Sequence, residues 1–341
     1  MKRRRTIDSV SEGKTKIRPS IPLDAKGKHV GYLTVPHSRD ESAWGALRVP
    51  IAVVKGGSGP SVLLTGGNHG DEFEGPLALL ELIGTLEPGL MRGRVLILPA
   101  LNYPALKAGR RLSPIDGGNM NRSFPGAANG TITQQIAHYV QTELLPGVDA
   151  VLDIHAGGRT LMFLPFAAVH QLADRAQMAR ASAALEAFGA PVGLVLEELD
   201  AEGMLDTAVE RMGKTFVSTE LGGGGSTTTL TVALARRGAL NLLRHWGALA
   251  GAIERPTKPT RLMRTDGASY TICEDDGFVE YLVDLGQVVR AGETLCRVRD
   301  IDRPLAEPAP YRAGRDGMLV GRCHGGRVVP GDFLALVAFD A

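Results

Sequence analysis

Cysteine is scarce in this chain, and the number and positions of the cysteines exclude two common kinds of site. Of the 341 residues only three are cysteine, and all three lie in the last quarter of the sequence. An odd and low count does not build a disulfide framework, and the wide spacing does not fit a zinc ribbon. A reducing cytoplasm is the compartment that fits this composition best. The three residues are Cys273, Cys296 and Cys323.

Long apolar runs and an excess of one charge are lacking as well. No run reaches the roughly 18 apolar residues that a membrane-spanning helix needs, so we expect no membrane partner. The net charge of +1 argues against bulk affinity for nucleic acid. The basic start MKRRR has no apolar stretch behind it, so it predicts a frayed, solvated end rather than a secretory signal.

Apolar runs of strand length alternate with helical patterns over residues 46–255, after a polar segment, 1–45, with short strand candidates. This alternation predicts an α/β fold: a mainly parallel, mixed sheet with helices on both faces. The length fits one large domain and one small one. We expect strands at 48–54, 61–66, 94–101, 149–155 and 214–221, and helices at 75–86, 133–145, 173–189 and 230–249.

The pattern changes after residue 254. Residues 254–261 contain two prolines and no apolar residue, which predicts a linker. The stretches 276–298 and 316–337 look alike, and such duplicated halves resemble the barrel-sandwich hybrid of biotinyl and lipoyl domains. Those domains carry a modifiable lysine between the halves, but the corresponding segment here, 299–314, has no lysine. We therefore expect residues 262–341 to form a small all-β, barrel-sandwich-like module with a structural role, not a cofactor carrier.

Reactive polar side chains follow four of the predicted strands. His69 and Glu72 come after one strand, and Asn102 comes after the next. His155 and Glu220 end two further strands. Ligands of open α/β sheets bind outside the carboxyl ends of the strands. We expect these side chains to meet at one edge of the sheet.

His69, Glu72 and His155 are a ligand set typical of catalytic zinc, which takes three protein ligands and keeps one position open. Each residue also has a simpler explanation, because a His-x-x-Glu turn is often solvated and a lone histidine often lies in the core. Their shared position at strand ends favours a site for one Zn²⁺ per subunit. Glu220, which is not a ligand, is then the candidate base. Asp71 is a candidate for orienting an imidazole.

Residues 109–126 form a polar connection with three arginines and two asparagines, long enough to suggest a function. An arginine fork matches a carboxylate, so Arg122 beside Asn121 could hold the carboxylate of a substrate. A second arginine could stabilise an oxyanion, and composition alone does not choose between Arg110 and Arg111. The simpler interpretation is a surface loop with solvated arginines.

The motifs NHGDE, NMNRSFPG, DIHAGG and TELGGGG, in this order and spacing, resemble the succinylglutamate desuccinylase/aspartoacylase family of the zinc carboxypeptidase superfamily. The resemblance covers about residues 50–250 and implies a zinc carboxypeptidase-like fold. It implies zinc ligation by His69, Glu72 and His155, acid–base chemistry by Glu220, carboxylate binding by Asn121 and Arg122, and carbonyl polarisation by Arg111, which stands one residue ahead of a Ser-Pro pair.

The SPIDGG insert and the appended β module are more like the bacterial subgroup that includes N-acetyl-diaminobutyrate deacetylase of ectoine breakdown. The resemblance thus implies zinc-dependent deacetylation of N-acetyl-L-2,4-diaminobutyrate. Another N-acyl amino acid, a metallocarboxypeptidase activity and a metal-free carboxylate-binding protein stay open as alternatives, as does a homo-oligomer. A diaminobutyrate side chain needs an acidic partner, and the candidates are Glu197, Glu198, Asp200 and Glu202.

Overall fold

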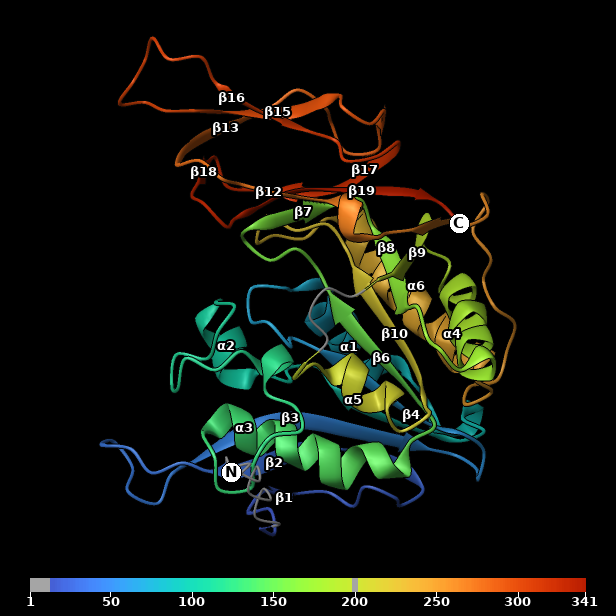
Figure 1. Cartoon of the computed structure of the whole chain (residues 1–341). Coiled ribbons are helices and arrows are strands. Elements are labelled where there is room, and N and C mark those ends of the chain that lie inside the picture. Colours follow the sequence, from blue (N-terminus) through green and yellow to red (C-terminus); the bar gives the residue numbers. More distant parts are fainter. Residues whose placement is uncertain (1–12, 198–201) are drawn as a thin grey trace, which may run out of the picture.

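A computed structural model describes residues 13–197 and 202–341 of the chain. They form a mixed α/β fold around one large twisted sheet (Figure 1). Its first strands are β1 (Arg18–Pro19), β2 (Gly27–Pro36), β3 (Ala46–Lys55), β4 (Ser61–Gly66), β5 (Arg94–Leu98), β6 (Ala150–His155), β7 (Leu161–Phe163), β8 (Phe166–His170), β9 (Val192–Leu196) and β10 (Thr215–Glu220). The helices are α1 (Glu74–Thr85), α2 (Tyr103–Ala108), α3 (Ile132–Tyr139), α4 (Arg175–Phe188), α5 (Leu205–Glu210) and α6 (Thr229–His245).

The centre of the sheet is parallel, and its flanks are mixed. Strands β5, β4, β6 and β10 lie side by side in parallel, and β8 then pairs antiparallel with β10. Strands β1, β2, β3 and β5 pair antiparallel at the other flank. Because β4, β6 and β10 run in the same direction, the loops that follow them leave the sheet at one edge.

Helices cover both faces of this sheet. Helices α1, α4 and α6 contribute to the core on one face, and α3 and α5 contribute to the core on the other. The central strands are buried on both faces, which explains why their sequences are continuous apolar runs. Helix α6 begins where Thr228 and Thr231 form a capping box, so its first backbone N–H groups have partners. Among the described residues, no helix is both long and apolar enough to cross a bilayer.

Most predicted elements are found, with differences at the start of the chain and after β6. Strand β2 has ten residues and pairs with β3 along its whole length, so residues 27–36 belong to the main sheet and form more than a short strand. The predicted helix 133–145 is α-helical only to Tyr139, and a π-helical segment follows at Val140–Leu144. Strands β7, β8 and β9 and the short helices α2 and α5 were not predicted.

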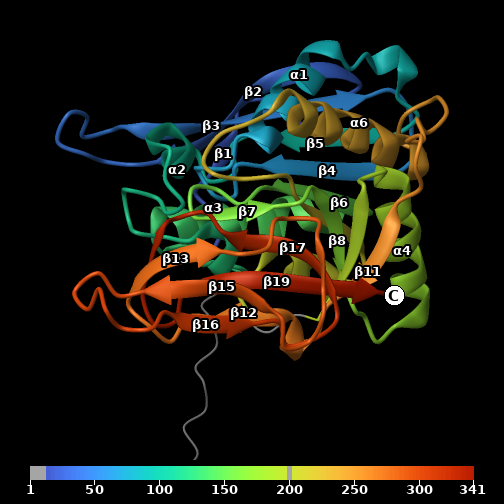
Figure 2. The same ribbon diagram turned by 90° about the horizontal axis from the view of Figure 1, so that it is seen from above.

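The C-terminal residues form β strands in two similar halves (Figure 2). In each half two strands pair antiparallel, β13 with β15 and β17 with β19. The short strand of each half crosses to the other, since β14 pairs with β17 and β18 with β13. The strands are β11 (Arg261–Arg264), β12 (Tyr270–Ile272), β13 (Gly277–Tyr281), β14 (Val288–Val289), β15 (Thr294–Arg299), β16 (Ala309–Arg312), β17 (Gly317–Cys323), β18 (Arg327–Val328) and β19 (Phe333–Asp340).

Some of these strands, β11, β12, β14, β17 and β19, continue the main sheet, whereas β13, β15, β16 and β18 form a separate four-stranded sheet. Strand β11 pairs in parallel with β9 and antiparallel with β19, and β7 pairs with β17. Apolar residues from β8 and β9 share a core with residues of β17 and β19. The three cysteines are free, as expected, and Cys273 and Cys296 are buried in the C-terminal core.

Candidate metal centre

The carboxyl ends of three neighbouring strands bring the predicted ligands together. In the register of the sheet, Thr65 of β4 lies beside Asp153 of β6, and His155 of β6 lies beside Glu220 of β10. The turn after β4 folds back tightly. A Cβ atom at Gly70 would lie 2.0 Å from the backbone carbonyl carbon of Ala105, so only glycine fits there. This turn delivers His69 and Glu72 to the end of β6.

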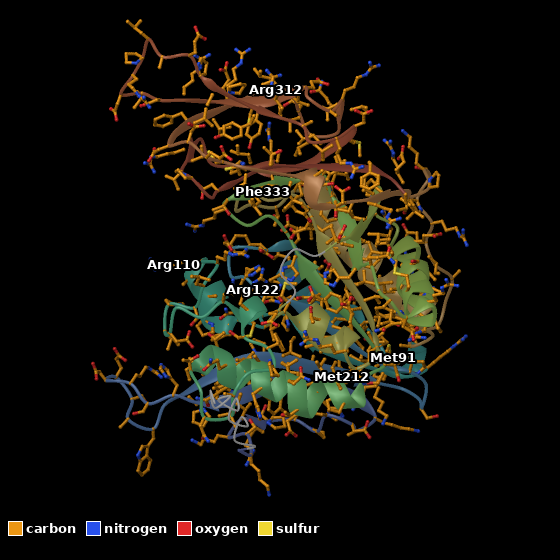
Figure 3. All side chains as sticks on the ribbon, in the orientation of Figure 1. Met91, Arg110, Arg122, Met212, Arg312 and Phe333 are labelled. Atoms are coloured by element: carbon orange, nitrogen blue, oxygen red, sulfur yellow. The ribbon has the colours of Figure 1, made fainter. Side chains whose placement is uncertain are left out.

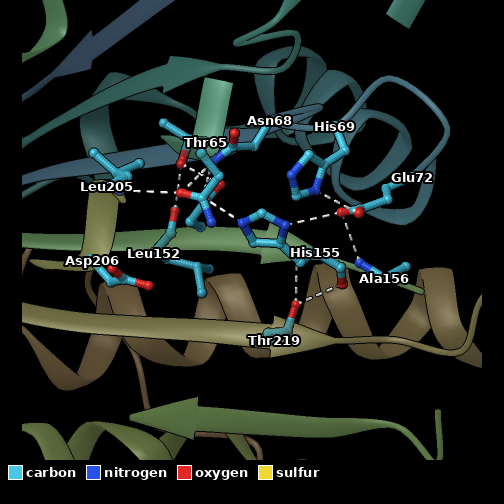
Figure 4. A network of polar contacts seen from close by, with 12 residues as sticks. Thr65, Asn68, His69, Glu72, Leu152, His155, Ala156, Leu205, Asp206 and Thr219 are labelled. Carbon is cyan, nitrogen blue, oxygen red and sulfur yellow. Dashed lines mark hydrogen bonds and ion pairs between the residues drawn. The ribbon is translucent and has the colours of Figure 1, made fainter. Parts of the chain in front are cut away.

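Both imidazoles face one carboxylate. Nδ1 of His69 lies 2.7 Å from Oε1 of Glu72, and Nδ1 of His155 lies 3.0 Å from Oε2 (Figure 4). One ligand atom from each of the three residues lies within 4.8 Å of the other two, and all three side chains are buried. Three convergent N and O donors at this spacing could hold one divalent cation.

The far side of the His155 ring is fixed by a buried carboxylate that sequence reasoning missed. Nε2 of His155 donates to Oδ2 of Asp153 at 2.7 Å. Asp153 is fully buried and also accepts from Thr65 Oγ1 and from Asn68 Nδ2, both at 2.7 Å. Because Nε2 makes this bond, the imidazole directs Nδ1 to the centre. This hydrogen bond behind the ring is typical of metal-ligating histidines.

The His69 ring is fixed in the same way by the polar connection 109–126. Nε2 of His69 lies 3.2 Å from Oδ1 of Asn119, which also accepts from the backbone N–H of Asn121 at 3.1 Å. Asn119 was missed as a separate contributor, although it belongs to the Asn-Met-Asn motif. Asp71 does not orient an imidazole among these contacts. It accepts a backbone hydrogen bond from Arg159 at 2.9 Å and so holds the turn after β6.

Electrostatics follow from this burial. Burial opposes protonation of His155, but the carboxylates of Asp153 and Glu72 outweigh it and raise its pKa well above the usual value. For Glu220, burial and the nearby charge of Glu72 raise the pKa to about 8. Its Oε2 has no hydrogen-bond partner among the described residues. A carboxyl group of this kind, beside a cavity, is a candidate for proton transfer.

A cavity of about 360 Å³ opens over the three candidate ligands. Arg111, Asn121, Arg122 and Glu220 line it. Nη1 of Arg111 lies 3.6 Å from Oε1 of Glu72. Arg110 does not line the cavity, and Figure 3 places it farther toward the outside of the molecule than Arg122.

One predicted contributor lies elsewhere. Asn102 is buried at the start of α2, where its backbone N–H donates to Gly67 O at 2.9 Å, and it does not line the cavity. The backbone of Gly223, three residues after Glu220, packs closely against another segment of the chain. A Cβ atom at Gly223 would lie 2.0 Å from the carbonyl oxygen of Leu161.

Comparison with known proteins gives a consistent result over almost the whole chain. Residues 58–246 match the succinylglutamate desuccinylase/aspartoacylase catalytic domain family. The chain is 48% identical over 323 residues to N-alpha-acetyl-L-2,4-diaminobutyric acid deacetylase of Halomonas elongata, covering 94% of each chain.

Solved structures agree with this match. The product-bound ectoine utilization protein EutE (DoeB) of Ruegeria pomeroyi is 48% identical, with a TM-score of 0.93 over 96% of this chain and 100% of that chain. A succinylglutamate desuccinylase of Silicibacter sp. TM1040 is 47% identical, with a TM-score of 0.92 over the same shares. The chain therefore belongs to the succinylglutamate desuccinylase/aspartoacylase family and is an amidohydrolase of N-acyl amino acids.

Proposed function

We propose that this protein removes the acetyl group from N-acetyl-L-2,4-diaminobutyrate in a zinc-dependent hydrolysis, with one zinc ion per chain. The observation that carries the proposal is the cavity in which two histidines and a glutamate converge beside a carboxyl group of raised pKa and two arginines. The identity to the Halomonas elongata deacetylase over 94% of both chains supports this choice of acyl group and amino acid.

The residues fit a zinc ion. Each imidazole directs Nδ1 toward the centre and uses Nε2 for a hydrogen bond to Asp153 or Asn119, so a metal ion that replaces the protons at the centre would be bound through both Nδ1 atoms. His69, His155 and Glu72 are the donor types of catalytic zinc sites. Zinc held by this set would act as a Lewis acid toward the acyl carbonyl and would favour deprotonation of the attacking water.

Glu220 carries the proton in this mechanism. Its carboxylate accepts the proton of the attacking water, and the resulting carboxylic acid gives that proton to the leaving amine. Its pKa of about 8, caused by burial and by Glu72, lies near neutral pH, where both transfers are feasible. Its unpartnered Oε2 leaves one oxygen for this exchange.

The polar connection 109–126 orients the substrate. The oxygen of the Asn121 side chain accepts from Leu205 N at 3.1 Å, so its NH₂ group is left to donate to a substrate carboxylate. Arg122 adds a charged, two-pronged donor for the same carboxylate. Arg111, close to Glu72, stabilises the oxyanion that develops on the acyl oxygen.

We further propose that the catalytic side chains and part of the cavity wall come from different parts of the chain. Residues 46–255 carry every proposed catalytic and metal-binding side chain. Residues 262–341, as a barrel-sandwich-like module, complete the wall of the cavity. Tyr270, Phe333 and Leu336 from that segment line it.

A substrate screen tests the proposal. Purified protein supplied with zinc is offered N-acetyl, N-succinyl and N-formyl amino acids, including N-acetyl-diaminobutyrate, together with a short peptide. We expect acetate release from N-acetyl-diaminobutyrate with the highest kcat/KM of the series. A higher kcat/KM for a succinyl amino acid or for the peptide would refute this choice of substrate.

A further inference from the structure

A second polar cluster lies apart from the metal ligands and the proposed base. His170, the last residue of β8, contacts two acidic residues of α5. Its Nδ1 lies 2.9 Å from Oε2 of Glu210, and its Nε2 lies 3.8 Å from Oδ2 of Asp206. The three side chains are only 11–12% exposed. Carboxylates this deeply buried need compensating charge or hydrogen bonds.

The cluster reaches the catalytic cavity through two of its members. His170 and Asp206 line that cavity, whereas Glu210 lines a neighbouring one. Among the described lining residues the other carboxylates are Glu72, a candidate ligand, and Glu220, the proposed base. Asp206 therefore gives the cavity an acidic group to which the hydrolysis itself assigns no task.

Backbone contacts fix the distance between Asp206 and the proposed carboxylate-binding residues. The N–H of Leu205, the residue before Asp206, donates to the side-chain oxygen of Asn121. Gly203 accepts from Phe124 N at 2.9 Å, and a Cβ atom at Gly203 would lie 2.8 Å from the carbonyl oxygen of Arg122. The start of α5 is thus seated directly on the Asn121–Arg122 segment, with no room for a side chain between them.

We propose that Asp206 binds the side-chain ammonium group of the substrate and selects N-acyl amino acids with a short cationic side chain. The inference deepens the proposed function and rests on it. Asn121 and Arg122 hold the α-carboxylate of the substrate. Asp206 follows Leu205, which contacts Asn121, and binds the side-chain ammonium group, which is only a few bonds from that carboxylate. His170 contacts Glu210 through Nδ1 and faces Asp206 with Nε2, so it positions the Asp206 side chain.

The acidic residues named from the sequence are placed differently. Glu197 lines the neighbouring cavity, and Glu202 is exposed. Glu198 and Asp200 lie outside the described residues. Asp206 lies on α5, four positions after Glu202. Its position on that helix, and not its place in the sequence, identifies it as the acidic partner.

The test compares two substrates that differ only in the ammonium group: N-acetyl-2,4-diaminobutyrate and N-acetyl-2-aminobutyrate. For each, kcat/KM is measured with zinc-loaded wild type, Asp206→Asn and Asp206→Glu. We expect Asp206→Asn to lower the ratio of the two values roughly 10- to 100-fold, as for the loss of one charged hydrogen bond, mainly through KM. Asp206→Glu should recover part of the ratio. Glu197→Gln, which removes the same charge from the neighbouring cavity, should keep the wild-type ratio.

Contrary results have distinct meanings. An unchanged ratio in Asp206→Asn overturns the inference alone. A parallel loss of activity on both substrates, or a loss of zinc, shows a structural role and also overturns it. A wild-type protein that hydrolyses neither substrate refutes the proposed function, and the inference falls with it.

Discussion

Asp153 shows how a residue that touches no substrate can control the site. It is fully buried, accepts from Nε2 of His155 and is itself held by Thr65 and Asn68. The sequence carried a signal for it, because residues two apart in a strand share a face, and Asp153 precedes His155 by two. Asp206 gave no comparable signal, since its place depends on how α5 packs against a distant loop.

Replacing Asp153 by asparagine should weaken zinc binding. The amide keeps the size of the side chain but loses the charge that orients the His155 ring, so we expect a loss of roughly 10- to 100-fold in zinc affinity. Competition with a chromophoric chelator measures it. Asp71→Asn is the matched control, because Asp71 contacts the backbone of Arg159 and no ligand ring. Equal zinc affinity of Asp153→Asn and wild type would contradict this role.

The polar connection 109–126 is an element whose function was easier to predict than its anchoring. Its length and arginines marked it as functional, and its Asn119 and Asn121 contact the site. The anchor is Asp116, whose oxygens accept from the backbone and hydroxyl of Thr133 at 2.7 and 2.8 Å and from Gly118 N at 3.0 Å. These bonds tie the connection to the first turn of α3.

Asp116→Asn should destabilise the protein by about 1–2 kcal/mol, because a charged acceptor of several hydrogen bonds is lost. Partial burial raises the pKa of Asp116, but its bonds to Thr133, Ser113 and Gly118 outweigh burial and lower it. A lowered pKa means that the contribution is present above pH about 4 and is lost as the pH falls through the folded-state pKa.

Urea unfolding of wild type and Asp116→Asn at pH 7 and near pH 3 measures this difference. We expect the gap between them to shrink at the lower pH. Asp40→Asn, a change at an exposed carboxylate between β2 and β3, is the control. A gap that is equal at both pH values would contradict the account of the anchor.

Most of the long secondary-structure elements were predictable, with the ten-residue strand β2 as an exception, and the short ones were not. Strand β4 was expected at the residues where it is found, and helices α1, α4 and α6 differ from expectation only at their ends. Strands β7 and β8 have three and five residues and lie on either side of Pro165, so no periodicity develops. Helices α2 and α5 have six residues each, which is too short for a helical pattern.

At the scale of the whole molecule, one sheet contains strands of both the α/β part and the C-terminal β part of the chain. The duplicated C-terminal halves were visible in the sequence, but their pairing with the main sheet through β11 and β7 was not, because strand partners distant in sequence leave no local signal. A core of residues from β8, β9, β17 and β19 spans the proposed boundary. Unfolding one part would expose this shared core.

We therefore expect one cooperative thermal transition for the full chain. Differential scanning calorimetry on the zinc-loaded protein measures it, with the calorimetric enthalpy compared to the van't Hoff enthalpy. Two well-separated transitions would contradict the shared core and would show that residues 262–341 unfold independently.

The central claim is that His69, Glu72 and His155 hold the zinc ion that hydrolysis requires and that Glu220 moves the proton. The most direct measurement is acetate release from N-acetyl-diaminobutyrate by chelator-treated protein titrated with zinc. We predict that activity rises from near zero and saturates at one zinc per chain. Glu220→Gln should bind the same amount of zinc but lose roughly 10²- to 10⁴-fold in kcat. Full activity in the chelated protein, or in Glu220→Gln, would contradict the account.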